Sequence, residues 1–327
     1  MTSSHVEVKR REALLIFPLS FYPFFADEIQ KALSNEGYNV VAANHEYPAN
    51  TIGKILGNLR IFWPLSLITE YVLSRDYLSG RHYDLVLIVK GRGIRRQLVK
   101  KLRQASSRIV AYNFDSFGYN PSPLRWYMDV DKYCTFDYVD SKVYALPLVE
   151  LFSSVPADER PKRIRYDVSA ILRNHSNRLK FLDAILNIVP SGNRFIYVLE
   201  LNIFTLIMNF LRSPRLYIKY RTHIHFKPLP YAQYVSVLKD SNFTLDYAHP
   251  KQSGITTRCF EALSTQTKVI TNNRFVKSNA FFSNENAIVF DGESSPMNVQ
   301  KQFESIKSST PAKYRRTVSD FLKDLLA

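Results

Sequence analysis

Short apolar runs that alternate with segments of helical spacing are the feature that most constrains the fold. Residues 13–17 and 85–89 are continuous apolar runs, as expected of strands buried on both faces of a sheet. A segment with helical spacing, residues 25–35, follows the first run, and a basic helical segment, residues 92–104, follows the second. Strands and helices in this order form parallel βαβ units, so the sequence predicts a doubly wound α/β sheet.

The alternation runs along the whole chain and predicts two such domains. In the first half we expect further strands at 38–43, 108–113 and 133–138, and a helix at 52–77 that breaks at Pro64. In the second half we expect strands at 166–172, 195–201, 223–227, 243–247, 268–271 and 287–290, and helices at 177–189, up to 211, at 231–240, at 255–264 and twice at the end. Two doubly wound domains that face each other would hold a ligand cleft between them, at the carboxyl ends of their strands.

The 327 residues suit two domains, and residues 153–165 mark the border. This segment is polar, charged and contains proline, as interdomain linkers do. We therefore expect an N-terminal domain over 1–155 and a C-terminal domain over 156–327, with the last helix free to pack back on the first domain.

Cysteine and histidine usage argues against disulfide and metal frameworks. Cys134 and Cys259 are the two cysteines, which is too few for a disulfide scaffold or a cysteine-based zinc site, and a reducing cytosol is the simplest compartment. His223 and His225 would share one face of a strand, but no third ligand stands near them. We expect no metal and no cofactor.

The charge balance predicts a polyanionic environment. Lys and Arg number 44 against 29 Asp and Glu, a formal net charge of +15. Such a surplus suits nucleic acid, anionic lipid or phosphorylated substrates, and does not choose among them. The basic helix at 92–104 and the aromatic segment 61–73 together suggest a membrane-surface patch on the first domain. The apolar stretches at 52–73 and 203–211 are too short or too charged to span a bilayer, so we expect a soluble or peripheral protein.

The stretch from Asp246 to Asn273 is the strongest candidate for a binding site. A strand ends, a polar loop follows, and a helix begins with Ser253 and Gly254 at its entry. Backbone N–H groups and the helix dipole at such an entry favour a diphosphate. Arg258 could contact phosphate and Glu261 could accept hydrogen bonds from ribose, on the same helix face as Gly254. The alternative is an ordinary loop with an Arg–Glu pair on the surface.

Two residues of the first half follow predicted strands and would face the cleft. Lys90 begins a KGRG turn, and Asp115 follows the strand at 108–113. Asp115 could orient an acceptor hydroxyl or act as a base. The alternatives are a plain turn at Lys90 and a helix N-cap by Asp115 or Ser116. Asp137 and Asp140 are interpreted as turn or cap residues.

Four stretches carry a resemblance to a known family. They are KGRGI at 90–94, YNFDSFGYNP at 112–121 with FDYVD at 136–140, YDVSAILRNHSNRLKFL at 166–182, and HPKQSGITTRCFEAL with KVITNN within 249–273. In these stretches the sequence resembles bacterial lipopolysaccharide and capsular-polysaccharide glycosyltransferases of the GT-B type, and more particularly the spore-maturation CgeB-like branch.

The resemblance implies transfer of a sugar from a nucleotide-sugar donor to a glycan acceptor in surface polysaccharide synthesis, including O-antigen. It implies that Gln252, Ser253, Gly254 and Thr256 line the diphosphate site, that Arg258 assists there, and that Glu261 holds the ribose. Lys90 and Asp115 would line the acceptor side and serve catalysis. A lipid-linked acceptor would place the protein in the cytoplasm, at the inner face of the plasma membrane, and we expect no nucleic-acid partner.

The chain departs from the family pattern at three places. Ser253 stands where many retaining GT-B enzymes carry the first of two glutamates, and Phe114 stands where a tryptophan is usual. Leu172 and Arg173 stand where related sequences often have a glycine. The Ser253 departure leaves open a non-catalytic protein that binds nucleotide sugars or carbohydrate. The net charge of +15 and the many Tyr and Phe residues leave open a basic nucleic-acid-binding protein. A phosphorylase or an epimerase on the same fold is a further alternative.

Overall fold

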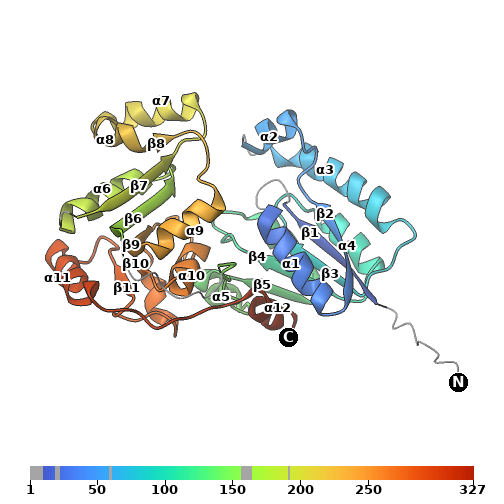
Figure 1. Cartoon of the computed structure of the whole chain (residues 1–327). Coiled ribbons are helices and arrows are strands. Elements are labelled where there is room, and N and C mark those ends of the chain that lie inside the picture. Colours follow the sequence, from blue (N-terminus) through green and yellow to red (C-terminus); the bar gives the residue numbers. More distant parts are fainter. Residues whose placement is uncertain (1–9, 19–22, 59–60, 156–163, 191) are drawn as a thin grey trace, which may run out of the picture. The chain divides into compact units, whose positions relative to one another are not determined.

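The computed structural model describes residues 10–18, 23–58, 61–155, 164–190 and 192–327, and they form two compact units. Unit 1 comprises residues 1–150 and 318–327, and unit 2 comprises 151–317. Each unit has its own parallel sheet with helices packed against it (Figure 1). Most of the predicted linker, residues 156–163, lies outside the described residues.

Unit 1 contains a five-stranded parallel sheet in the order β2-β1-β3-β4-β5. The strands are β1 (Arg11–Phe17), β2 (Tyr38–Asn44), β3 (Leu85–Val89), β4 (Ile109–Asn113) and β5 (Lys132–Thr135). Every residue of β3 and β4 is buried, as the continuous apolar runs predict. The core joins Leu14, Ile16, Val86 and Ile88 of the strands to Leu98 of a covering helix.

The helices of unit 1 confirm most of the predicted segments and correct two. They are α1 (Pro23–Asn35), α2 (Thr51–Asn58), α3 (Phe62–Leu73) with a π-helical turn (Ser74–Leu78), α4 (Arg96–Gln104) and α5 (Tyr138–Tyr144). The predicted break at Pro64 is wrong, because Pro64 lies in the first turn of α3, where no intrahelical N–H bond is lost. The predicted helix start at residue 92 is also wrong, because Gly91 and Gly93 take positive φ angles of 60° and 77°.

The predicted strand 133–138 is too long, since its last residue already starts α5. Asp137 caps that helix: its carboxylate accepts hydrogen bonds from the N–H groups of Val139 and Asp140. The predicted cap role of Asp137 is therefore confirmed.

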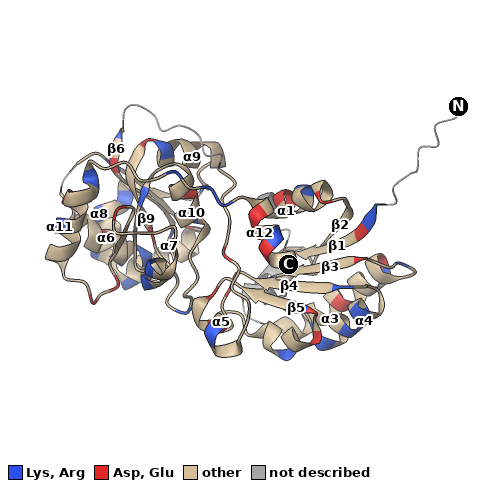
Figure 2. Cartoon of the chain, turned by 90° about the horizontal axis from the view of Figure 1, so that it is seen from below, with Lys and Arg blue, Asp and Glu red and all other residues tan. Residues whose placement is uncertain are grey.

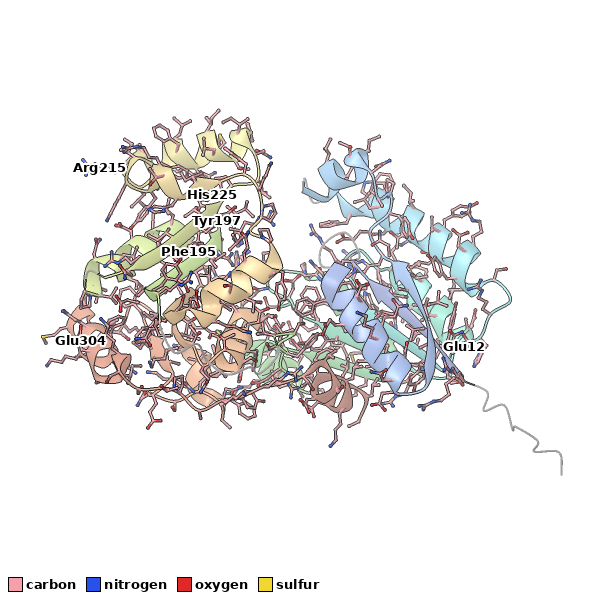
Figure 3. All side chains as sticks on the ribbon, in the orientation of Figure 1. Glu12, Phe195, Tyr197, Arg215, His225 and Glu304 are labelled. Atoms are coloured by element: carbon pink, nitrogen blue, oxygen red, sulfur yellow. The ribbon has the colours of Figure 1, made fainter. Side chains whose placement is uncertain are left out.

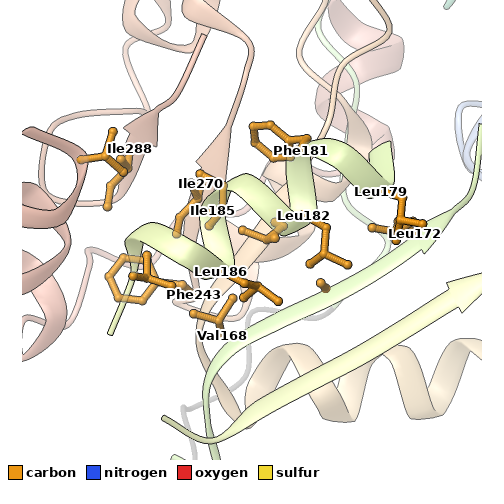
Figure 4. Packing of buried hydrophobic residues seen from close by; sticks show 14 of the residues in the cluster. Val168, Leu172, Leu179, Phe181, Leu182, Ile185, Leu186, Phe243, Ile270 and Ile288 are labelled. Carbon is orange, nitrogen blue, oxygen red and sulfur yellow. The ribbon is translucent and has the colours of Figure 1, made fainter. Parts of the chain in front are cut away.

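Unit 2 contains a six-stranded parallel sheet in the order β11-β10-β9-β6-β7-β8. The strands are β6 (Tyr166–Arg173), β7 (Arg194–Leu199), β8 (Ile224–His225), β9 (Ser241–Asp246), β10 (Lys268–Thr271) and β11 (Ala287–Val289). The helices are α6 (Arg178–Ile188), α7 (Ile203–Arg212), α8 (Pro214–Tyr220), α9 (Tyr231–Lys239), α10 (Thr257–Ser264) and α11 (Pro296–Lys307). Leu182 and Ile185 of α6 pack with Phe243 and Ile270 of the sheet in the core of this unit (Figure 4).

Two elements of unit 2 differ from the sequence prediction. Helix α8 has no predicted counterpart, although Pro214 at its first position is a common helix start. The predicted strand 223–227 shrinks to the two residues of β8, and His223 lies in a 3₁₀ turn before it. His225 stacks on Tyr197 with ring centroids 3.9 Å apart, and both residues are labelled in Figure 3.

Helix α12 (Val318–Leu326) follows all of unit 2 in the sequence but packs in unit 1. It lies beside α1 (Figure 1), and Phe321 packs edge-on against Tyr112 of β4 with ring centroids 4.9 Å apart. Arg108 and Lys132 donate hydrogen bonds to the carbonyl groups of Leu326 and Asp324 at the end of the helix. Helix α1, strand β4 and helix α12, which are distant in the sequence, therefore pack together in unit 1.

Candidate functional site

Each sheet has one point where its winding reverses, and ligands of doubly wound folds bind at such points. In unit 2 the reversal lies between β9 and β6, because β9 connects towards β10 and β6 connects towards β7. In unit 1 it lies between β1 and β3. The residues that follow these strands are therefore the candidates for a binding site in each unit.

The loop after β9 is held in shape by two asparagines that follow β10. Asn272 exchanges hydrogen bonds with the backbone of Ala248, at 2.8 Å and 3.1 Å. The Asn273 amide donates to the carbonyl oxygens of Ser253 and Gly254, at 3.1 Å and 2.9 Å. The KVITNN stretch thus fixes both ends of the predicted phosphate loop, with the Ser253 and Gly254 carbonyls turned towards Asn273.

The start of α10 is left without a side-chain cap. Thr256 occupies the N-cap position, but its hydroxyl donates to Asp246 Oδ1 at 2.7 Å instead of capping the helix. Asp246 Oδ2 accepts from Thr271 Oγ1 at 3.2 Å, so this buried carboxylate organises the loop. The N–H groups and dipole of the first turn remain suited to an anion, as the sequence predicts.

Arg258 and Glu261 lie on α10, and Gly254 lies before the helix begins. Arg258 Nη1 is 3.8 Å from Asp246 Oδ1. Glu261 is 7% exposed, and its two carboxylate oxygens accept hydrogen bonds from Tyr231 at 3.1 Å and Tyr234 at 2.6 Å. Burial raises the pKa of Glu261, although both tyrosine hydroxyls favour its ionised form. The alternative of a surface Arg–Glu pair is therefore wrong.

A cationic group at the switch point was missed by the sequence analysis. Arg178, the first residue of α6, donates to the carbonyl oxygens of Tyr247 at 3.3 Å and Arg173 at 3.4 Å, and so ties the ends of β6 and β9 together. The rings of His175 and His249 lie 6.4 Å apart, centroid to centroid. Burial, and then the charges of Arg178 and Arg173, lower the pKa of His175 to about 4. The sequence did contain a signal for this group, because basic residues follow both of the neighbouring strands β6 and β9.

In unit 1 the two predicted catalytic residues lie together. Lys90 Nζ is 3.4 Å from Asp115 Oδ2, and both side chains are largely buried. Lys90 takes a positive φ of 69°, its N–H donates to the Tyr112 carbonyl, and its own carbonyl accepts from Asn120. A Cβ on Gly91 would come within 2.5 Å of the Trp126 ring, so this turn requires glycine. The other six predicted residues all belong to unit 2.

The N-cap alternative for Asp115 is wrong. The hydroxyl of Ser116 accepts from the Tyr119 N–H at 3.1 Å in a turn, and no α-helix follows directly. Asp140 Oδ2 accepts a 2.6 Å hydrogen bond from the Phe117 N–H and so holds the same loop. Burial raises the pKa of Asp140 to about 6.

His45 is a further candidate residue that the sequence analysis missed. It follows β2 directly and is 2% exposed, and neither ring nitrogen has a hydrogen-bond partner among the described residues. Burial lowers the pKa of His45 to about 4, and the positive charge of Lys90 acts in the same direction. An isolated histidine after a strand carries no sequence signal that distinguishes it from a surface residue.

The described residues contain no group of three or more His, Cys, Asp or Glu that could hold a metal ion. In the same residues no helix has the length and apolarity needed to cross a bilayer.

Among the comparisons with known proteins, the one with solved structures finds matches. The sequence matches no protein-family model and no curated protein. Among solved structures, the apo form of the lipopolysaccharide outer core galactosyltransferase WaaB is similar with a TM-score of 0.57, at 12% identity over 96% of this chain and 98% of that one. A glycosyltransferase from Rickettsia africae reaches 0.56, at 12% identity over 97% and 94%.

A UDP-GlcNAc 2-epimerase from Methanocaldococcus jannaschii is also similar, with a TM-score of 0.52, at 10% identity over 96% of this chain and 99% of that one. The chain therefore has the GT-B fold of two parallel Rossmann-like sheets, which glycosyltransferases and nucleotide-sugar epimerases share. The predicted fold class is confirmed.

Proposed function

We propose that this protein is a glycosyltransferase that moves a sugar from a nucleotide-sugar donor bound by unit 2 to a glycan acceptor bound by unit 1. The observation that carries the proposal is the switch point of unit 2, where Arg178 supplies the positive charge and His175, with its pKa lowered to about 4, is neutral near pH 7. Arg178, His175 and His249 meet there beside the loop that leads into the uncapped α10. Such a set of groups complements the diphosphate of a nucleotide sugar.

Donor binding by this site follows from its chemistry. The diphosphate would lie against Arg178 and the loop of Gln252, Ser253, Gly254 and Thr256. Arg258 would support the same charge from α10. When the sugar leaves, negative charge grows on the nucleoside diphosphate, and fixed N–H groups and cations stabilise that charge without a metal or cofactor.

Glu261 would hold the ribose in this proposal. Its two oxygens already accept from Tyr231 and Tyr234, so a ribose hydroxyl must take the place of one tyrosine hydroxyl. Tyr231 is the one expected to give way, since its side chain is exposed and its hydrogen bond is the longer.

Asp115 would accept the proton of the acceptor hydroxyl, or orient that hydroxyl, in unit 1. The ammonium group of Lys90, 3.4 Å from Asp115 Oδ2, would hold the carboxylate in position for this role. The acceptor would be a lipid-linked glycan of bacterial surface polysaccharide at the inner face of the plasma membrane. The exposed Trp63 and Tyr71 of α3 support a position at a membrane interface.

A nucleotide-sugar epimerase is the second candidate, because the fold is equally that of such enzymes. Both candidates bind the same donor class, and they differ in the product. An epimerase converts a nucleotide sugar without an acceptor, whereas a transferase releases the nucleoside diphosphate only when it consumes an acceptor.

The test is a thermal-shift and calorimetric screen of the purified chain against UDP, GDP, CMP, dTDP and ADP without metal. We expect one nucleotide to stabilise the fold, and Arg178→Gln to weaken its binding by about tenfold or more, the loss of one charge-assisted contact. Lys301→Gln, an exposed change on α11, is the matched control. Failure of all five nucleotides to bind would overturn the proposal.

With the selected nucleotide sugar, product analysis then separates the candidates. Asp115→Asn should lower glycosyl transfer by about 100-fold or more while nucleotide affinity stays unchanged. Epimerised sugar in the absence of any acceptor would favour the epimerase instead.

A further inference from the structure

Helix α7 presents its apolar side away from its own core. Among its ten residues none is buried. Its inward side carries Asn209, whose amide donates to both oxygens of the buried Glu200 at 3.3 Å, and Leu206, which packs against the core of unit 2. A surface helix of a globular domain normally does the reverse and turns its apolar stripe inward.

The outward side of α7 is a continuous apolar stripe. Ile203, Ile207 and Leu211 are spaced four residues apart, and Phe204 and Met208 lie beside them on the same helix face. Phe204 and Leu211 are 69% and 68% exposed, and Ile203 is 62% exposed. Ile218 of the adjoining α8 is exposed as well. We call these six residues the α7–α8 apolar surface.

Exposed arginines stand next to these residues in the sequence, and acidic residues are absent from this part of the chain. Between Glu200 and Asp240 the sequence contains no Asp or Glu, but it contains Arg212, Arg215 and Arg221, all exposed. Arg215 projects outward from α8 in Figure 3. Lys219 is the exception, because it pairs with Asp183 of α6 at 2.5 Å.

The basic helix of unit 1 is different in this respect. The Lys and Arg residues of α4 are conspicuous in Figure 2, but Arg96, Lys101 and Arg103 pair with Asp129, Glu70 and Asp131 respectively. Their charge is largely compensated within unit 1. The arginines beside the α7–α8 apolar surface have no acidic neighbour on their own helices.

We propose that the α7–α8 apolar surface docks on an anionic lipid bilayer. An apolar stripe with flanking arginines matches the acyl boundary and the negative headgroups of such a bilayer. The ten residues of α7 are too few to span it, so the helix would lie in the interface. A second copy of the chain fits less well, because a two-fold contact would bring the arginines of both copies together.

The test is co-sedimentation of the full chain with vesicles. We expect binding to vesicles of phosphatidylcholine that contain about 30% phosphatidylglycerol. We expect weak binding to vesicles of phosphatidylcholine alone. Phe204→Ser with Leu211→Ser should lower the partition coefficient by about 30-fold or more, since two large apolar side chains no longer insert. Arg212→Gln with Arg215→Gln should lower it by about tenfold or more and reduce its salt dependence.

Met297→Ser is the matched control, because Met297 is an equally exposed apolar residue on α11, which follows the opposite edge strand β11. Unchanged vesicle binding in the Phe204→Ser and Leu211→Ser double variant would overturn the proposal. So would a large fall in its thermal midpoint, or a dimer in sedimentation velocity that this variant dissolves. These measurements do not involve nucleotide or activity, so their outcome is independent of the proposed transferase function.

Discussion

Lys90 Nζ lies 3.4 Å from Asp115 Oδ2, across the carboxyl ends of the neighbouring strands β3 and β4. The two side chains leave only 4% and 11% of their surfaces exposed, so the ion pair is largely shielded from solvent. The pair is thus both a structural contact of unit 1 and the one place where two predicted catalytic residues meet.

Replacing Lys90 alone should lower the stability of the fold. We expect Lys90→Met to lower the free energy of unfolding by about 3 kcal/mol, because it removes the cation that lies beside the buried Asp115 carboxylate. Lys90→Met combined with Asp115→Leu should recover most of that loss, since neither charge then remains. Urea unfolding of the parent chain, Lys90→Met, Asp115→Leu and the double variant measures this, with Lys301→Gln as the control. Additive losses in the double variant would show that the two residues do not act as a pair.

Buried His45 should make the fold sensitive to acid. Its pKa is lowered to about 4 in the folded chain, whereas an unfolded histidine has a pKa of about 6.5. Below pH 6.5 the unfolded state therefore binds the proton more readily, and stability falls as the pH falls towards 4. The loss reaches about 3 kcal/mol from this residue. His45→Leu should remove that share of the pH dependence in urea unfolding between pH 7 and 4.5, and an unchanged slope would contradict the assignment.

The amide of Asn273 should matter for nucleotide binding, because it holds the proposed phosphate loop. Asn273→Ala removes the hydrogen bonds to the Ser253 and Gly254 carbonyls and should cost about 2 kcal/mol of stability. Nucleotide affinity should fall by about tenfold as the loop loses its fixed shape. Asn298→Ala, an exposed change on α11, serves as the control in calorimetry. Full affinity in Asn273→Ala would mean that the loop does not contact the ligand.

Substitutions of Glu261 and of Tyr231 should change nucleotide affinity in opposite directions. Glu261→Gln weakens acceptance of the ribose hydroxyls, so nucleotide affinity should fall by about tenfold. Tyr231→Phe removes the hydroxyl that competes for Oε1, so affinity should rise by about threefold or more. Calorimetry with the nucleotide selected by the screen measures both. A loss of affinity in Tyr231→Phe would assign this hydroxyl to the ligand instead of to competition with it.

The fold was predictable where a single local pattern decided each element. Strands β3 and β10 fall on their predicted residues because both are short apolar runs between polar ends. The FDYVD stretch misled for a physical reason: Phe136, Tyr138 and Val139 favour strands, but Asp137 satisfies the first N–H groups of a helix. Helix α8 has seven residues, too few for a clear helical period.

The candidate site was predictable in part. The order of strands already placed Lys90 and Asp115 at neighbouring strand ends, and the loop chemistry pointed to Gly254 and Arg258. The tyrosine partners of Glu261 could not be predicted, because nothing in the α9 sequence indicates which α10 residue it faces. Long-range packing, not local sequence, decides such pairs.

The position of α12 at the end of the sequence affects how unit 1 folds while the chain is being synthesised. The core of unit 1 includes Phe321 and Leu325, which a ribosome adds only after all of unit 2. The nascent first unit therefore leaves the Tyr112 side of its sheet uncovered while the second unit is made. Chaperones that bind exposed apolar strands should engage the chain during that interval, and a premature stop before Val318 should yield an aggregation-prone product although unit 2 is intact.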